Sequence, residues 1–331
     1  MSTAVARART LARVTYSIVA LDPATGDLGV AVQSKFLAVG AVVPWAAAGV
    51  GAVATQSFAN VTFGPAGLAH MAGGLSATHA LERLVSADPL RGQRQVGIVD
   101  THGGAATHTG GSCFAWAGGI TGPGFAAQGN ILAGSSVVDG LVDTLVAGGR
   151  PFPELLVACL EAADAQGGDR RGRESASLLV VRAGGGYGGA NDRWVDLRVD
   201  HHDDPIGQLG RLLDLQRLYL DRPAIGDLKV VDATLAAELR SLLTRIGAEP
   251  GGRFGNVYQP MNPDAANAGT DAGERPMTGT PGPLPSNWDA DWQGALWDWM
   301  GVENLEERTA APGWIDPRVL TVLRARANAA R

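Results

Sequence analysis

Thr15 stands directly before an alternating apolar run, within the stretch RVTYSIVALDPATGDLGVAVQSK at residues 13–35. A threonine hydroxyl becomes a nucleophile when a neighbouring base takes its proton. At the first position of a mature chain the threonine's own α-amine can be that base, because its ordinary pKa is about 8. This hypothesis requires cleavage between Val14 and Thr15, or translation from a start nearer Thr15. The alternative is a structural threonine at the start of a β-hairpin.

Lys35 follows the second apolar run and is the next candidate. A hairpin over 16–21 and 27–32 returns the end of the second strand to the start of the first. A lysine buried there would lower the pKa of the nucleophile. The alternative is a solvated charge at a strand end. Ser34, its neighbour, is a candidate for substrate binding.

Two further stretches gather polar side chains at expected strand ends. In ATQSFAN, the residues Thr55, Gln56 and Asn60 either line a substrate pocket or cap a turn. Gln128 and Asn130 alternate along one strand and therefore share a face. Carboxamides on one face suit an oxyanion hole or the recognition of an amide.

Charged and basic candidates occur in two other places. His108 is a candidate base or binding residue, although a single histidine equally suits a structural role. The stretch GGDRRGRESA at 167–176 lies between an expected helix and an expected strand. There Asp169 can orient an ammonium group and Arg171 can bind a carboxylate through two hydrogen bonds. The alternative is an ion-paired connector.

The stretch DHHDDP at 200–205 offers Asp200, His202 and Asp204 as metal ligands for a metal-assisted hydrolase. Adjacent residues on an extended segment point to opposite sides, however, and an aspartate before a proline is typical of a helix start. We therefore expect no metal and no cofactor. The sequence also lacks a phosphate-binding loop, a dinucleotide fingerprint, a G-x-S-x-G elbow and an H-E-x-x-H helix.

Composition limits the classes of protein that the chain can be. Of its 331 residues, 45% are hydrophobic and 18% charged, which favours a sizeable buried core. A net charge of −6 without a basic run argues against nucleic acid as a partner. No apolar stretch is long enough to span a membrane.

The cysteines and the first residues bear on the compartment. Cys113 and Cys159 cannot build a disulfide framework, so we expect a reducing, cytoplasmic environment. Residues 1–14 contain three arginines, and no apolar segment separates them from the first expected strand. This pattern is unlike a secretory signal. We expect this leader to be disordered or removed.

Hydrophobic periodicity predicts strands, two helices, strands, two helices, and strands again. Because few βαβ units occur, this order predicts an α+β fold of largely antiparallel sheets with helices on their outer faces. The expected strands are 16–21, 27–32, 38–44, 49–57, 94–100, 105–109, 124–130, 176–182 and 193–199, and the expected helices are two after Gly64-Pro65 that break near Gly73-Gly74, then 135–147, 153–166 and 205–220.

A change in composition after residue 222 predicts a second domain over 223–331, following a first domain over 15–222. A helix is expected at 233–247 and a Pro/Gly-rich linker at 259–286. The remainder is a small, mostly helical unit rich in tryptophan: Trp288, Trp292, Trp297, Trp299 and Trp314. Tryptophan-rich surfaces often form interfaces, so we expect a homodimer.

Long stretches of the chain resemble the bacterial DUF1028 family, which has the Ntn-hydrolase (N-terminal nucleophile) fold. The resemblance covers about residues 15–220, and it rests on TYSIVALDPATGDLGVAVQSKFLAVGAVVPWA, GVGAVATQSFAN, HTGGSCFAWAGGITGPGFAAQGNILAG, GGDRRGRESASLLVV and RVDHHDDPIGQL. The later stretches WQGALWDWMGVENLEER and IDPRVLTVL resemble a peptidoglycan-binding-like extension found on some members.

This resemblance implies a four-layer αββα sandwich with Thr15 as the nucleophile that attacks an amide carbonyl. Lys35 is similar to the lysine near the nucleophile in the threonine-type branch of these hydrolases. Most DUF1028 members begin with Met directly before this threonine, whereas fourteen residues precede Thr15 here.

Two hypotheses for function follow. In the first, the protein hydrolyses a small linear amide or ureido (N-carbamoyl) compound. Backbone amides with Asn130 or Gln128 then hold the oxyanion, and Arg171 or Lys35 holds a substrate carboxylate. In the second, the protein is a non-catalytic binding module whose C-terminal segment contacts cell-wall glycan or a partner protein.

Overall fold

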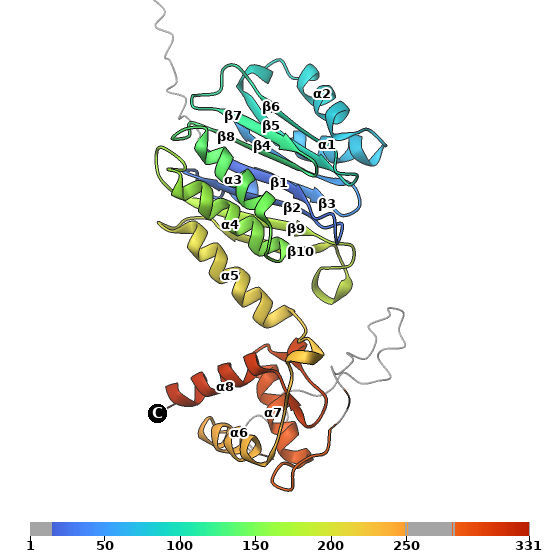
Figure 1. Cartoon of the computed structure of the whole chain (residues 1–331), viewed down its shortest axis with the longest axis vertical. Helices are drawn as coiled ribbons and strands as arrows, with labels where there is room; N and C mark the ends of the chain where they lie inside the picture. The colour runs from blue at the N-terminus through green and yellow to red at the C-terminus, as the bar shows by residue number, and fades with distance from the viewer. Residues whose placement is uncertain (1–14, 249, 251–279, 281, 331) are drawn as a thin grey trace, which may run out of the picture. The chain divides into compact units, whose positions relative to one another are not determined.

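The computed structural model describes residues 15–248, 250, 280 and 282–330 (Figure 1). The predicted leader at 1–14 and most of the predicted linker at 259–286 lie outside these residues. Internal contacts divide the chain into two units, 1–213 and 214–331, and each is described by itself.

A six-stranded sheet forms the larger half of the first unit, and every neighbouring pair of its strands is antiparallel. Its order is β10-β9-β2-β1-β8-β7. In chain order the strands are β1 (Thr15–Leu21), β2 (Leu28–Ser34), β7 (Gly118–Gly122), β8 (Phe125–Asn130), β9 (Ser175–Val181) and β10 (Arg193–Val199).

A four-stranded antiparallel sheet packs on one face of the first, with the order β3-β4-β5-β6. Its strands are β3 (Pro44–Ala47), β4 (Gly51–Ser57), β5 (Arg94–Asp100) and β6 (Ala105–Thr109). Valine and alanine side chains such as Val19, Val30 and Ala54 fill the space between the sheets.

Helices cover the outer face of each sheet (Figure 1). Phe63, Leu81 and Leu84 belong to α1 and α2, and they pack on the four-stranded sheet. Leu141, Leu156 and other apolar residues of α3, α4 and α5 form a core with the six-stranded sheet. The helices are α1 (Phe63–Ala72), α2 (Ala77–Ala87), α3 (Ser136–Ala147), α4 (Phe152–Ala165) and α5 (Pro205–Leu220), and short 3₁₀ turns occur at η1 (Val39–Ala41), η2 (Arg91–Gln93) and η3 (Tyr187–Gly189).

β1 lies between β2 and β8, with helices over one face and the second sheet over the other. Its side chains alternate accordingly: Ile18 and Ala20 join the helix-side core, and Val19 joins the core between the sheets. Burial on both faces explains why the strand is apolar along most of its length. The polar residues Thr15 and Ser17 are therefore exceptions that need buried partners.

The second unit has its own core around two buried tryptophans, Trp288 and Trp299. Arg308 and Asp316 form a buried ion pair at 2.6 Å, and Arg308 Nε also donates to the carbonyl of Leu218. The elements are α6 (Ala233–Arg245), α7 (Ala290–Val302), α8 (Pro317–Ala329), the strands β11 (Lys229–Val230) and β12 (Trp314–Ile315), and the turns η4 (Ile225–Asp227) and η6 (Glu306–Arg308).

The sequence predicted the antiparallel sheets, the helices and the helical C-terminal unit, but two strands of the first unit differ. The predicted strand at 38–44 is wrong, because Ala38 has a left-handed backbone (φ 54°) and η1 follows it. The strand β7 was missed, since its sequence GGITG has no apolar alternation and only pairing with β8 defines it. Among the described helices, none combines the length and hydropathy of a membrane span.

We predict that Gly97→Ala destabilises the first unit by about 1–3 kcal/mol. A Cβ at Gly97 would lie 2.0 Å from Oε1 of Gln128, which is buried between the sheets and held by hydrogen bonds. Urea unfolding measures the change. Gly111→Ala is the matched control, because a Cβ there meets nothing within 4 Å. Equal stability of the two variants would contradict the prediction.

Candidate functional site

Thr15 lies in a row of polar residues that crosses the six-stranded sheet. The register places Asn130 of β8 on one side of Thr15 and Ser34 of β2 on the other, with Ser175 of β9 beyond Ser34. Residues paired across antiparallel strands share a face, so these side chains lie abreast. Thr15 is 4% exposed, and its Oγ1 lies 3.0 Å from Ser34 Oγ. The candidate nucleophile therefore has a hydroxyl neighbour inside the protein.

Gln56 reaches this row from the four-stranded sheet. Its Nε2 lies 3.3 Å from the carbonyl oxygen of Thr15 and 2.8 Å from Gln95 Oε1, and donates to both. Asn130 Nδ2 donates to the same two oxygens, at 3.5 Å and 2.8 Å. The carbonyl of Thr15 is thus held by a carboxamide from each sheet.

Gln95 of β5 is a member of the site that sequence analysis missed. It is fully buried and joins Gln56 to Asn130 through its Oε1. No chemical motif surrounds it in RQVGIVD, so its type and spacing gave no functional signal. The available signal was a glutamine inside a strand expected to be buried, because such a group needs hydrogen-bond partners.

A small cavity adjoins Thr15 and has a volume of about 10 Å³, close to the space that one water needs. Thr15 and Gln56 supply polar groups to it, and the other walls are mainly apolar: Phe36, Val39, Val42, Val43, Ser57 and Ala59. In this conformation the cavity has room for a water beside the hydroxyl but not for a larger molecule.

Asp169 lies at the end of the sheet where β1 begins. Its backbone forms a bridge with Leu132, beyond β8, and its Oδ2 accepts from the N–H of Lys35, beyond β2, at 2.9 Å. Because β1 runs between β2 and β8, this carboxylate lies across the start of β1. Burial raises the pKa of Asp169, although hydrogen bonds from the N–H groups of Arg171 and Lys35 oppose that shift.

The structure corrects the predicted burial of Lys35 and gives the contacts of Asp169 and Arg171. Lys35 is not buried beside Thr15: its side chain is 39% exposed, and its Nζ pairs with Glu174 at 2.7 Å and bonds the carbonyl of Arg173. The lysine follows the strand end, where it can reach a carboxylate in water. Asp169 accepts from the backbone N–H groups of Lys35 and Arg171, and the Arg171 side chain pairs with Asp169 at 3.4 Å.

Thr55 and Asn60 are not brought to Thr15, whereas their neighbour Gln56 is. Thr55 alternates with Gln56 on β4, so it faces the other way, and its Oγ1 donates to the carbonyl of Asn60. Asn60 bonds Asp88, whose pKa is lowered to about 2, chiefly by its hydrogen bond from Arg94. These two residues stabilise a turn, which was the alternative interpretation.

His108 and Gln128 also lie outside the immediate surroundings of Thr15. His108 Nε2 lies 3.0 Å from the carbonyl oxygen of Arg91. Its neighbours Thr107 and Thr109 on β6 point the other way, toward the space between the two sheets. Gln128 comes two residues before Asn130 on β8, and its Nε2 donates to Ser17 Oγ at 2.7 Å.

The Asp200–Asp204 segment makes other contacts. Asp200 pairs with Arg198, and His201 pairs with Glu174. His202 Nδ1 accepts from the N–H of Asp204, as in a helix-start turn. Within the described residues no group of three or more His, Cys, Asp or Glu could hold a metal.

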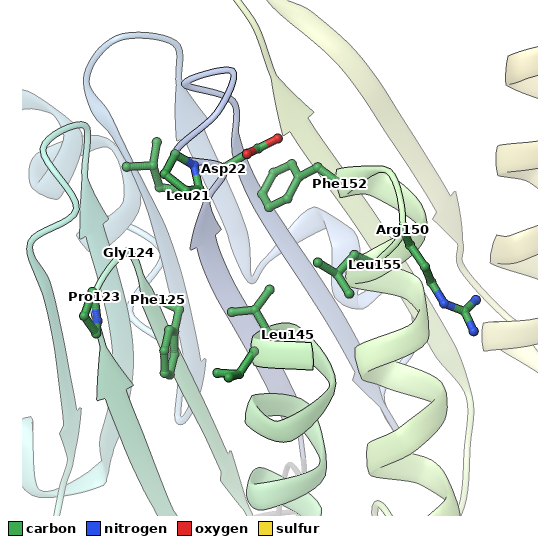
Figure 2. A pocket seen from close by; sticks show the side chains of 11 residues that line it. Leu21, Asp22, Pro123, Gly124, Phe125, Leu145, Arg150, Phe152 and Leu155 are labelled. Carbon is green, nitrogen blue, oxygen red and sulfur yellow. The ribbon is translucent and has the colours of Figure 1, made fainter. Parts of the chain in front are cut away.

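A larger cavity of about 360 Å³ lies at the opposite end of β1, next to Leu21 (Figure 2). Phe125, Leu145, Phe152 and Leu155 line it, and Figure 2 shows the guanidinium of Arg150 extending away from them. At about 3.3 Å per strand residue, β1 separates this cavity from Thr15 by about 20 Å. The cavity is therefore not part of the Thr15 site.

Comparison with known proteins places the chain in a family. The family DUF1028, described as a family of unknown function, matches residues 15–209. The chain belongs to the DUF1028 family. The chain is similar to the DUF1028 protein SPO2555 from Silicibacter pomeroyi, whose crystal structure is known. The two sequences are 32% identical, and the structures match with a TM-score of 0.56 over 62% of this chain and 89% of that chain. A putative peptidoglycan binding domain matches residues 281–323. Among curated proteins none matches.

We predict that Asp169→Ala in this DUF1028 protein exposes the backbone N–H groups that the Asp169 carboxylate holds after β2 and before β9. Loss of charged hydrogen bonds should speed hydrogen exchange of the Lys35 and Arg171 N–H groups about tenfold or more. Amide exchange followed by NMR measures this. Asp164→Ala is the control, because Asp164 pairs with Arg173 in the same region. Unchanged exchange in Asp169→Ala would refute the role.

Proposed function

We propose that the protein is an N-terminal-nucleophile amidohydrolase for a small linear amide or ureido compound, with Thr15 as the nucleophile. The paired sheets with helices on both outer faces are consistent with the four-layer αββα sandwich of Ntn-hydrolases. The observation that carries the proposal is the position of Thr15: a buried hydroxyl at the first residue of β1, 3.0 Å from Ser34 Oγ and beside a cavity the size of one water.

The chemistry starts after cleavage of the Val14–Thr15 bond frees the α-amine. Thr15 Oγ attacks the substrate carbonyl while its proton passes to that amine. The C–N bond then breaks, and the leaving amine takes the proton. A water attacks the resulting ester and releases the acid, which restores the Thr15 hydroxyl. The cavity beside Thr15 has space for this water.

Asp169 supports the same step through its charge. Asp169 is buried near the N-terminal end of β1, where the free ammonium of Thr15 would lie. An opposite charge beside an ammonium favours its protonated form, and desolvation of the amine favours the neutral form. The balance between these two effects sets how much of the amine is available as a base.

Of the predicted oxyanion donors, the two carboxamide NH₂ groups already have acceptors. Asn130 Nδ2 donates to Thr15 O and Gln95 Oε1, and Gln128 Nε2 donates to Ser17 Oγ. We therefore assign the oxyanion to backbone N–H groups. Arg171, which pairs with Asp169, and Lys35, which pairs with Glu174, remain the two candidates for binding a substrate carboxylate.

We predict that active protein begins at Thr15 and that Thr15→Val abolishes hydrolysis of amide and ureido substrates. Valine keeps the side-chain shape and removes the nucleophilic oxygen. Thr15→Ser, which keeps a hydroxyl, should retain hydrolysis. Intact mass with N-terminal sequencing establishes the start, and a substrate panel establishes the rates. Undiminished hydrolysis by Thr15→Val, or by a chain that still begins at Met1 or Ser2, would falsify the mechanism.

A second function rests on the match of residues 281–323 to a putative peptidoglycan binding domain. Trp288 and Trp299 are buried in the core of that unit, so they stabilise the fold and cannot bind glycan. Trp292, Trp297 and Trp314 are partly exposed and are the available aromatic surfaces.

On this second function the full-length protein should co-sediment with insoluble peptidoglycan and not with cellulose. Thr15→Val should co-sediment equally, because the nucleophile takes no part in glycan binding. Protein that stays in the supernatant with peptidoglycan contradicts this function and leaves the amidohydrolase proposal untouched.

A further inference from the structure

The carboxamide of Gln95 can point in only one direction. Its Nε2 donates to the carbonyl oxygens of Gly129 at 2.7 Å and Gly118 at 3.2 Å. Carbonyl oxygens only accept hydrogen bonds, so the amide nitrogen of Gln95 must face them. Its Oε1 consequently faces the opposite way, toward Gln56 and Asn130.

This direction determines how the next two carboxamides lie. Gln95 Oε1 only accepts, so both Gln56 and Asn130 must present their NH₂ groups to it, each at 2.8 Å. The second N–H of each NH₂ group then faces the carbonyl of Thr15, and Gln56 Nε2 also lies 3.4 Å from the carbonyl oxygen of Gln128. Gln56 Oε1 is left to accept from Ser17 Oγ at 2.7 Å.

This arrangement of the three carboxamides leaves one hydrogen-bond acceptor without a partner. Asn130 is 1% exposed, and its Oδ1 has no hydrogen bond. A buried polar atom of this kind costs about 1–3 kcal/mol. Turning the Asn130 amide over would set Oδ1 against Gln95 Oε1 and Thr15 O, which are both acceptors. The network thus maintains the orientation of Asn130 even though one atom remains unsatisfied.

We propose that Gln95 is a positioning residue, which fixes Thr15 for catalysis by orienting the Gln56 and Asn130 carboxamides on the Thr15 carbonyl. This inference rests on the proposed function of Thr15 as the nucleophile. Gln95 lies in the opposite sheet, and among the described residues its hydrogen bonds go to other residues than Thr15. Its effect on the reaction therefore passes through the two carboxamides.

Gln33 provides a matched control for any substitution of Gln95. Both are fully buried strand glutamines. Gln33 pairs in register with Tyr16, on the helix side of the sheet, and neither atom of its amide has a partner. A substitution at Gln33 therefore changes a buried glutamine without touching the network.

The first test measures the orientation directly. In protein labelled with ¹⁵N, the side-chain NH₂ groups of Gln56 and Asn130 should exchange slowly in wild type and in Gln33→Leu. In Gln95→Leu they lose their acceptor and should exchange about tenfold faster or more. Equal protection in Gln95→Leu overturns the proposal. Should Gln95→Leu not fold, Gln95→Met serves, because methionine approximates the length of the side chain and supplies no oxygen acceptor.

The second test measures the consequence for catalysis, with an amide that the wild type hydrolyses. In Gln95→Glu the ionised carboxylate cannot donate to Gly129 O, so kcat should fall about 100-fold with little change in KM. Protonated glutamate donates again, and activity should return as the pH is lowered. A pH profile parallel to those of wild type and Gln33→Leu overturns the proposal.

The two tests separate this proposal from the function on which it rests. If the wild type hydrolyses no amide, the proposed function fails. The exchange of the Gln56 and Asn130 NH₂ groups still shows whether Gln95 orients them.

Discussion

Burial of polar side chains between two sheets is the constraint on which the Thr15 site depends. Carboxamides and hydroxyls removed from water need partners, and here the partners come from the opposite sheet. Gln56 and Gln95 meet Thr15 and Asn130 across the interface, where valine and alanine fill the rest of the space. The packing of the sheets and the geometry of Thr15 are therefore linked: a shift of one sheet would break hydrogen bonds that hold the Thr15 carbonyl.

The end of the sheet at Thr15 is closed by segments that follow β2 and β8. The residues after β2 and β8 are joined through Asp169, and Phe36 and η1 lie over the small cavity. A hydroxyl in such a place is shielded from bulk water, and electrostatic interactions are stronger there than in solvent. A substrate larger than one water must displace some of these segments, and the exposed pair of Lys35 with Glu174 lies on the outside of the same region.

The C-terminal unit uses its tryptophans differently from what its composition indicated. Trp288 and Trp299 fill a small core between three helices, and the buried pair of Arg308 with Asp316 fixes the segment that precedes α8. A small unit gains much of its stability from large aromatic side chains. Trp292, Trp297 and Trp314 are only partly buried, so part of their aromatic surface stays exposed to solvent.

Local patterns in the sequence were enough to predict the antiparallel fold, the helical C-terminal unit, a strand beside Thr15 and the shared face of Gln128 and Asn130. Periodicity and turn chemistry are local, so they are readable along the chain. Which polar residues meet is visible only in the folded chain. The tertiary structure separated Thr55 from Gln56, sent Lys35 to Glu174, removed His108 from the site and introduced Gln95. Contacts between sheets join residues distant in sequence, and no local pattern records which buried amide will face which carbonyl.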